Sequence, residues 1–184
     1  MIPFPVHTIE TAPAASRPAL EALHCAFGFV PNMAGAMATS PVLIESLVGL
    51  FGKVHGGSFS EPEIQVLLLT NAVTNEAAWA VAFHSHLALA QGIAEADIVA
   101  MRAGQAPRPP RLAALSNLAR ALISRRGHVD ETEEQAFLAA GFGADHLLEV
   151  IAVVAASAMT NYTSSVTRPP LDEAIARWAW SGKA

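Results

Sequence analysis

The chain has 184 residues, of which 52% are hydrophobic and only 15% are charged, and its formal net charge at pH 7 is -5. This length can bury a core as one compact domain or as two small ones. Because 11 Lys and Arg stand against 16 Asp and Glu without a long basic run, we expect no nucleic-acid partner. The high apolar fraction predicts subunit contacts, so the expected partner is a second copy of the chain in a homo-oligomer.

Neither the N-terminal residues nor the longest apolar run indicates export or membrane insertion. Residues 1–5 lack the positive and apolar regions of a signal peptide. The run 150–159 is far shorter than the roughly 20 residues that cross a bilayer. We therefore expect a cytoplasmic protein with no membrane partner. The single cysteine, Cys25, cannot form an internal disulfide, and its apolar neighbours predict a buried structural thiol.

Helix signals follow one another along the chain after a Pro- and Ala-rich arm at 1–15. Ser60 with Glu63, and Asp130 with Glu133, have the spacing of capping boxes, in which each side chain satisfies a free amide of the first turn. The expected helices lie at 16–28, 33–39, 40–53, 60–73, 75–92, 95–102, 112–126, 130–141 and 145–159.

No stretch alternates convincingly with the period of two that a half-buried strand requires. The predicted fold class is therefore all-α, a single-domain bundle of about nine or ten helices over residues 1–184. A last helix at 173–184 carries Trp178 and Trp180, whose apolar area is too large to leave in water, so we expect it at a subunit interface.

The stretch Asn75–Gly92 carries the strongest candidate functional residue, His84. Asn75 is expected to cap this helix at its N-terminus. At about 100° per residue, Ala77, Ala80 and His84 fall within roughly 60° of one another, so the imidazole shares one face of the helix with two alanines. Such a histidine is either a hydrogen-bonded core residue or part of a reactive site.

Other polar and aromatic residues near His84 have simpler explanations. His86 lies about 200° from His84 on the helix, so the two cannot share an ion unaided, and we expect neither metal nor cofactor. His55 and Glu61 are explained by helix ends and capping. Trp79 points away from the His84 stripe and is expected to pack in the core or an interface.

The order of these motifs resembles a known superfamily. GFVPN at 28–32, a Ser-Pro-capped helix, a capping box, a histidine helix, the segment DETEEQAFLAAGF and an apolar helix ending at Asn161 follow in sequence. Over residues 16–172 this order is similar to the carboxymuconolactone decarboxylase and alkyl hydroperoxidase D-like superfamily, particularly its peroxidase-related branch. The resemblance implies all-α subunits that assemble as dimers, trimers or hexamers, and a Glu-x11-Cys-x2-Cys-x3-His relay that reduces hydroperoxides.

Three of the four relay positions are replaced in this chain. His84 stands at the family histidine, whereas the cysteine positions are Ala77 and Ala80 and the glutamate position is Gln65. Alanine has no thiolate to attack a peroxide, and glutamine cannot take up a proton at neutral pH. The decarboxylase branch needs no cysteine, but its carboxylate near the histidine is also missing from this helix.

The resemblance also places a pocket beside His84. Gln65 would face the histidine from the preceding helix, and Asn161 and Tyr162 would lie near the pocket. Equally simple explanations are a helix-surface amide for Gln65, a helix cap for Asn161 and a packed ring for Tyr162.

The expected function is a divergent small-molecule enzyme, or a pocket, that uses His84 as an acid or base and is not a thiol peroxidase. Its partner would be a small apolar ligand. One alternative is a ligand-binding or structural pseudoenzyme oligomer, and another is an antioxidant, peroxidase-like role in name only.

Overall fold

Every regular element within residues 3–182, the part of the chain that the computed structural model describes, is a helix. The ends of the predicted N-terminal arm and C-terminal helix, residues 1–2 and 183–184, lie outside this range. The helices are η1 (Ala14–Ser16), α1 (Arg17–Phe27), α2 (Asn32–Met37), α3 (Pro41–His55), α4 (Glu61–Thr74), α5 (Ala78–Ala90), α6 (Glu95–Arg102), α7 (Pro110–Ser124), α8 (Glu131–Ala139), α9 (Ala144–Thr167) and η2 (Glu173–Trp178). The predicted all-α fold class is confirmed.

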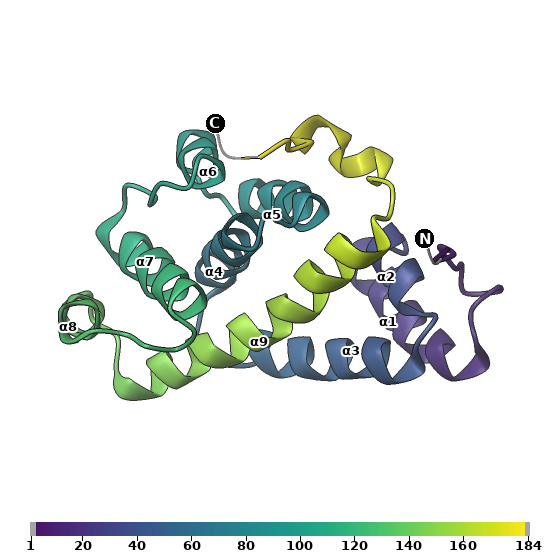
Figure 1. Cartoon of the computed structure of the whole chain (residues 1–184), viewed down its shortest axis with the longest axis horizontal. Helices are drawn as coiled ribbons and strands as arrows, with labels where there is room; N and C mark the ends of the chain where they lie inside the picture. The colour runs from purple at the N-terminus through teal and green to yellow at the C-terminus, as the bar shows by residue number, and fades with distance from the viewer. Residues whose placement is uncertain (1–2, 183–184) are drawn as a thin grey trace.

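Helices α4 and α5 form the centre of the bundle (Figure 1). Helix α7 packs on α4, and the long α9 crosses the molecule diagonally, in contact with α3, α4 and α5. Helices α1 and α2 lie at one end with α3, and α6, α7 and α8 lie at the other. The chain after α9 returns over α5 towards α6.

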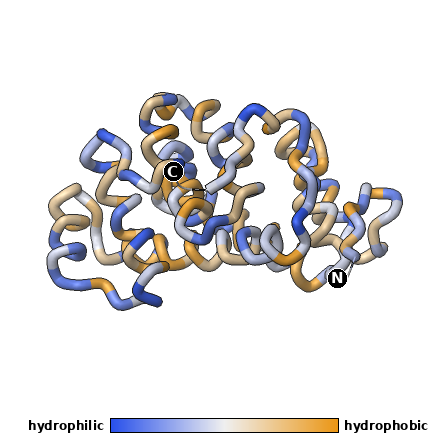
Figure 2. The backbone as a smooth tube through the Cα atoms, turned by 45° about the horizontal axis from the view of Figure 1, so that its top comes forward, coloured by the Kyte–Doolittle hydropathy of each residue, from blue (hydrophilic) through white to orange (hydrophobic). Residues whose placement is uncertain are grey.

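Burial of α4 on all sides follows from its sequence. Its apolar residues Ile64, Leu67, Leu68 and Leu69 point in several directions and all are buried, as expected for a helix that neighbours surround. Hydrophobic colour in Figure 2 follows the helices, whereas many of the connecting segments are hydrophilic.

Both predicted capping boxes are present. The amide and hydroxyl of Ser60 donate to one carboxylate oxygen of Glu63 at 2.9 and 2.7 Å. The other oxygen of Glu63 accepts a hydrogen bond from Arg111 Nε at 2.7 Å. These contacts hold the pKa of Glu63 below its usual value even though its burial acts in the opposite direction. The start of α4 is thereby fixed against α7.

The predicted N-cap of the histidine helix is wrong by two residues, since Ala77 and not Asn75 occupies that position. Asn75 ends α4 as its C-cap, and its side-chain amide donates backwards to the carbonyl of Asn71 at 2.9 Å. Glu76 takes a positive φ of 54°, and α5 begins at Ala78. Asparagine can cap either end of a helix, so its position alone did not distinguish an end from a start.

Helix α9 is longer than predicted because its last turns are polar. The hydroxyls of Thr163, Ser165 and Thr167 donate to carbonyls four residues earlier, so a helical segment looks like a loop in the sequence. By length and composition alone, α9 could cross a membrane. One such helix is weak evidence, and α9 packs against α2, α3, α4, α5 and α7 with 39% of its apolar window buried.

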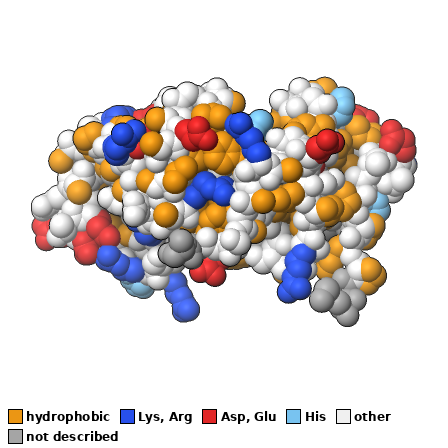
Figure 3. Space-filling view, turned by 90° about the horizontal axis from the view of Figure 1, so that it is seen from above, with side chains coloured by type: hydrophobic (Ala, Val, Ile, Leu, Met, Phe, Trp, Pro, Cys, Tyr) orange, Lys and Arg blue, Asp and Glu red, His pale blue; other side chains and the backbone are white. Residues whose placement is uncertain are grey.

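The predicted burial of Cys25 is also wrong. Helix α1 lies at the edge of the bundle, where Ala19 and Leu20 are its buried residues and Cys25 is exposed. Hydrophobic residues are exposed elsewhere too, including Val42 on α3 and Leu148 and Val166 on α9. On the face shown in Figure 3, hydrophobic side chains are interspersed with charged ones of both signs.

The C-terminal tryptophans contact their own chain, and Trp180 remains half-buried in the single subunit, so the predicted interface position of this segment stays a prediction. Trp178 is 6% exposed. Arg102, at the end of α6, donates to the carbonyl of Trp178 at 2.9 Å, to that of Ala179 at 2.8 Å and to Ser85 Oγ at 3.0 Å. In return, Trp180 Nε1 donates to the carbonyl of Arg102 at 3.2 Å. One arginine therefore fastens the C-terminal segment to α5 and α6.

Replacing Arg102 should release this segment. Arg102→Met keeps the aliphatic stem but leaves two carbonyls without their donor, so we expect a loss of about 1–3 kcal/mol in the free energy of unfolding. Urea unfolding and limited proteolysis after residue 168 measure the effect. Arg126→Met, at an exposed arginine, is the control. Equal stability and equal proteolysis of the two variants would contradict the proposed role of Arg102.

Candidate functional site

A cavity of about 490 Å³ lies beside His84, between α1, α2, α3 and α5. Its lining is mostly aliphatic and aromatic. Four polar side chains reach it, and they are His55, Glu61, His84 and Thr160. A concave, mostly apolar space with a few polar groups is the usual form of a small-molecule site.

His84 lies on α5, is 4% exposed and is held by the neighbouring helix. Its Nδ1 is 3.1 Å from Oε1 of Gln65 on α4. A carbonyl oxygen only accepts, so Nδ1 carries the proton and Nε2 is the nitrogen with a free lone pair. The structure thus brings together the two residues that the resemblance paired.

Burial controls the protonation of His84. Loss of solvent, and secondarily the charge that nearby His55 carries when it is protonated, lowers the pKa of His84 from 6.5 to about 3. The imidazole is therefore neutral at physiological pH and has no second proton to donate. Of the acid and base roles expected for His84, a neutral imidazole with a free Nε2 favours the one that accepts a proton or hydrogen bond, and this role stays a prediction.

The alanines that the resemblance placed at the cysteine positions do not line the cavity. Ala77 and Ala80 are both buried, Ala77 immediately before α5 and Ala80 in its first turn. The cavity-facing residues of α5 are instead Trp79, Phe83 and His84.

Of the two α9 residues expected at the pocket, neither lines it. Asn161 is buried and donates to Ser157 Oγ at 3.2 Å, whereas Tyr162 is 62% exposed and borders a separate surface hollow. Thr160 is the α9 residue that reaches the cavity. Because each step along a helix turns by about 100°, three successive residues face the cavity, the core and the solvent.

Trp79 belongs to the cavity wall, which the sequence did not predict. It stacks on Phe83, with ring centroids 4.9 Å apart, as residues four apart on a helix can. Its Nε1 donates to Oδ2 of Asp172 at 3.1 Å, and the backbone amide of Asn32 donates to Oδ1 at 2.9 Å. Burial raises the pKa of Asp172. The hydrogen bond to this carboxylate fixes the orientation of the Trp79 indole.

His55 and Glu61 are the other site residues that sequence reasoning missed. His55 ends α3 and Glu61 begins α4, and His55 Nδ1 lies 2.9 and 3.1 Å from the two carboxylate oxygens. Both side chains line the cavity and remain partly exposed, at 35% and 44%. The sequence signal that could have identified this pair was a histidine and a glutamate on either side of a Gly-rich loop.

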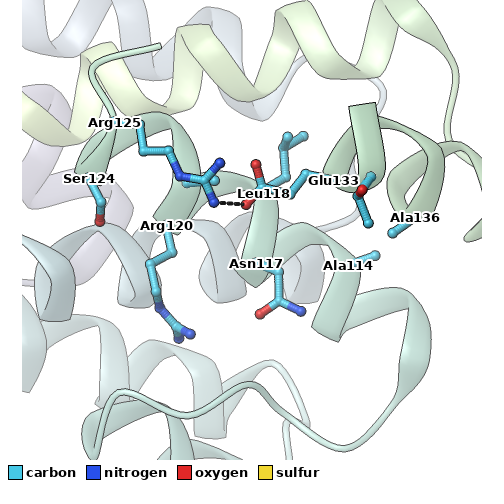
Figure 4. A pocket seen from close by; sticks show the side chains of 10 residues that line it. Ala114, Asn117, Leu118, Arg120, Ser124, Arg125, Glu133 and Ala136 are labelled. Atoms are coloured by element: carbon cyan, nitrogen blue, oxygen red, sulfur yellow. Dashed lines mark hydrogen bonds and ion pairs between the residues drawn. The ribbon is translucent and has the colours of Figure 1, made fainter. Parts of the chain in front are cut away.

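Metal binding has little geometric support within residues 3–182, where no three His, Cys, Asp or Glu side chains are grouped closely enough to hold an ion. A second hollow, of about 430 Å³, lies between α7 and α8 and contains none of the predicted residues. In this hollow, Arg125 already pairs with Asp130 at 2.8 Å and with Glu133 at 2.7 Å. The side chain of Arg120 points away from Arg125 (Figure 4). The cavity beside His84 is therefore the better candidate.

Comparisons with known proteins identify the fold. No family model and no curated protein matches the chain. Among solved structures, the alkylhydroperoxidase AhpD core of an uncharacterized peroxidase-related protein from Ralstonia eutropha JMP134 superposes with a TM-score of 0.82. It covers 100% of this chain and 99% of its own, at 17% identity. The chain has the AhpD-like fold.

Two further structures share the AhpD-like fold. A peroxidase-related protein from Silicibacter sp. TM1040 has a TM-score of 0.79 at 16% identity, over 95% of this chain and 92% of that one. The debrominase Bmp8 has a TM-score of 0.75 at 15% identity, over 90% of each chain. The fold expected from the order of motifs is confirmed.

Proposed function

We propose that the protein binds a small, uncharged and largely aromatic molecule in the cavity beside His84. The observation that carries this proposal is the state of the imidazole. It is neutral, its Nδ1 proton is engaged by Gln65, and it lies in the wall of an otherwise apolar space. A ligand with one N–H or O–H donor can satisfy Nε2 while its ring packs on Phe83 and Trp79.

Thiol chemistry does not fit this site. Cys25 is the only cysteine of the sequence, it is exposed on α1, and it is not among the cavity residues. The alanines at the two family cysteine positions are packed in the core. We therefore infer a binding protein or enzyme that works without a thiol and is not a cysteine-dependent peroxidase.

The neighbours in fold support the class of ligand. The debrominase Bmp8 is also known as a cysteine-to-alanine variant in complex with 2,3,4-tribromopyrrole, and that structure superposes with a TM-score of 0.73 at 17% identity. This molecule is a small apolar ring with a single N–H donor. It has the features that the cavity of this chain would recognise.

We also infer that the protein works as a cytoplasmic homo-oligomer. Val42, Leu148, Tyr162 and Val166 are large apolar residues that remain exposed in the single chain. Covering such residues is a usual reason for subunits to associate. Light scattering coupled to gel filtration measures the number of subunits.

Calorimetric titration with 2,3,4-tribromopyrrole tests the proposed ligand class. We expect binding with a Kd of roughly 1–100 μM, which corresponds to about 5–8 kcal/mol. His84→Ala should weaken binding at least 10-fold because it removes the acceptor and part of the wall. Ala26→Phe, which places a ring at the cavity wall, should reduce binding to below detection.

Leu138→Ala is the matched control, since Leu138 is exposed on α8 and lies outside the cavity. It should bind the ligand as tightly as the unchanged protein. The proposal fails if no binding is detected, or if binding is the same in all three variants.

A further inference from the structure

The ends of α3 and α4 place a histidine and a carboxylate together at the cavity. α3 stops at His55, the chain turns through Gly56 and Gly57, and α4 begins at Glu61. A cationic side chain is favoured at a helix C-terminus and an anionic one at an N-terminus, so the two helix ends themselves stabilise this pair.

Glu61 determines which nitrogen of His55 is free. Both carboxylate oxygens lie within 3.1 Å of Nδ1, so Nδ1 carries a proton and donates it to the carboxylate. Nε2 then has the free lone pair. The ring also stacks on Phe51, another cavity residue, at 6.0 Å between centroids and 29° between planes. A carboxylate that orients an imidazole and balances its charge when it is protonated is a recurring catalytic device.

His84 cannot fulfil this role. It is only 4% exposed and neutral, and protonating it would place a charge without a counter-ion in the apolar wall of the cavity. His55 is 35% exposed on its side chain, so it can pass a proton to water after receiving one. The groups facing His55 from the adjoining helices are the carboxylate of Glu61 on α4 and the neutral imidazole of His84 on α5.

We propose that His55 is the general base of a proton-transfer site in this cavity, with Glu61 as its positioning residue. This inference rests on the proposed function, because the substrate is an apolar molecule bound against His84. The chemical step is removal of a weakly acidic C–H proton. The C–H bond breaks, its electron pair stays on the substrate, and the proton binds Nε2 of His55 and then leaves to water. Isomerisations and eliminations begin with this step.

5-Nitrobenzisoxazole is a suitable probe, because it is a small aromatic molecule whose ring opens when a base removes one proton. The proton on its C3 goes to the base, the electron pair forms the nitrile, and the N–O bond breaks to release a coloured 2-cyano-4-nitrophenolate. No other reactant is needed. Turnover by the 184-residue chain is followed by absorbance against free imidazole at the same concentration.

We expect saturable turnover by the unchanged protein. His55→Gln should lower kcat by at least 100-fold with little change in KM, in keeping with the usual contribution of a general base. Added imidazole should restore part of the activity of His55→Ala, which a purely structural role of the side chain does not predict. Glu61→Gln should lower kcat about 10-fold, and Glu61→Asp, which keeps the charge, should recover most of it. His128→Gln, at an exposed loop histidine, is the control.

Two results would overturn the dyad. One is turnover no faster than that of free imidazole, and the other is turnover that His55→Gln leaves unchanged. The ordinary explanation, a partly exposed ion pair between two helix ends, then suffices. If 2,3,4-tribromopyrrole still binds in either case, the pocket stands and only the base is wrong. If it does not bind, the proposed function fails as well.

Discussion

Between pH 7 and pH 5 the protein should lose about 2 kcal/mol of its free energy of unfolding through His84 alone. The unfolded chain binds a proton on this imidazole below its ordinary pKa of 6.5, whereas in the folded protein burial lowers that pKa to about 3. The unfolded state therefore binds more protons across this interval, and stability rises with pH. The contribution is complete above pH 6.5 and is lost progressively as the pH falls towards 3.

Urea unfolding at pH 5, 6 and 7 measures this dependence. His84→Gln removes the titrating group but keeps a donor that can reach Gln65, so its stability should vary about 2 kcal/mol less over the same interval. The carboxylates with lowered pKa, including Glu63 and Asp130, affect stability at more acidic pH and are common to both proteins. His128→Gln should behave like the unchanged chain. Parallel curves for all three proteins would show that His84 is solvated and not in a closed site.

The parts of the fold that could be predicted from the sequence depend on residues close together in the chain. Ser60 with Glu63, and Asp130 with Glu133, capped helices where their spacing indicated. Local spacing gave a wrong cap prediction where a side chain could hydrogen-bond to the helix before it or to the helix after it. Asn75 capped the helix before it and not the one after it, because its amide found the carbonyl of Asn71.

Burial required knowledge of how distant segments pack. Cys25 has apolar neighbours in sequence, yet it is exposed because α1 lies at the edge of the bundle. Trp178 has the apolar area expected of an interface residue, but Arg102 provides bonding partners for this segment within the same chain. Composition shows that apolar area must be covered and does not show which surface covers it.

The site was predicted only in part for the same reason. The resemblance paired Gln65 with His84, and their contact joins two adjacent helices. Helical periodicity could not show that α1 and α3 leave a cavity on one side of α5, which makes Trp79 a wall residue and turns Asn161 away. His55 was placed correctly at a helix end, but the sequence did not show that this end of α3 borders the cavity.

Asp172→Ala is expected to destabilise the protein by about 2–4 kcal/mol, although Asp172 lies outside the cavity. The carboxylate is 8% exposed and accepts hydrogen bonds from the amide of Asn32 and from Nε1 of Trp79, residues 140 and 93 positions away in the chain. Its removal leaves two buried donors unpaired and separates the C-terminal segment from α2 and α5. Asp172→Asn keeps an oxygen acceptor and should lose less than Asp172→Ala.

The same substitution should also affect the cavity, since Asp172 fixes the indole that forms part of its wall. Urea unfolding gives the stability, and titration of Asp172→Asn with 2,3,4-tribromopyrrole gives the binding, which we expect to weaken about 3- to 10-fold through the looser Trp79. Glu173→Ala, at the exposed neighbouring carboxylate, is the control for both measurements. Reduced stability with unchanged binding would mean that stacking on Phe83 alone positions Trp79. Unchanged stability would mean that water replaces the carboxylate, in which case the C-terminal segment depends mainly on Arg102 for its attachment.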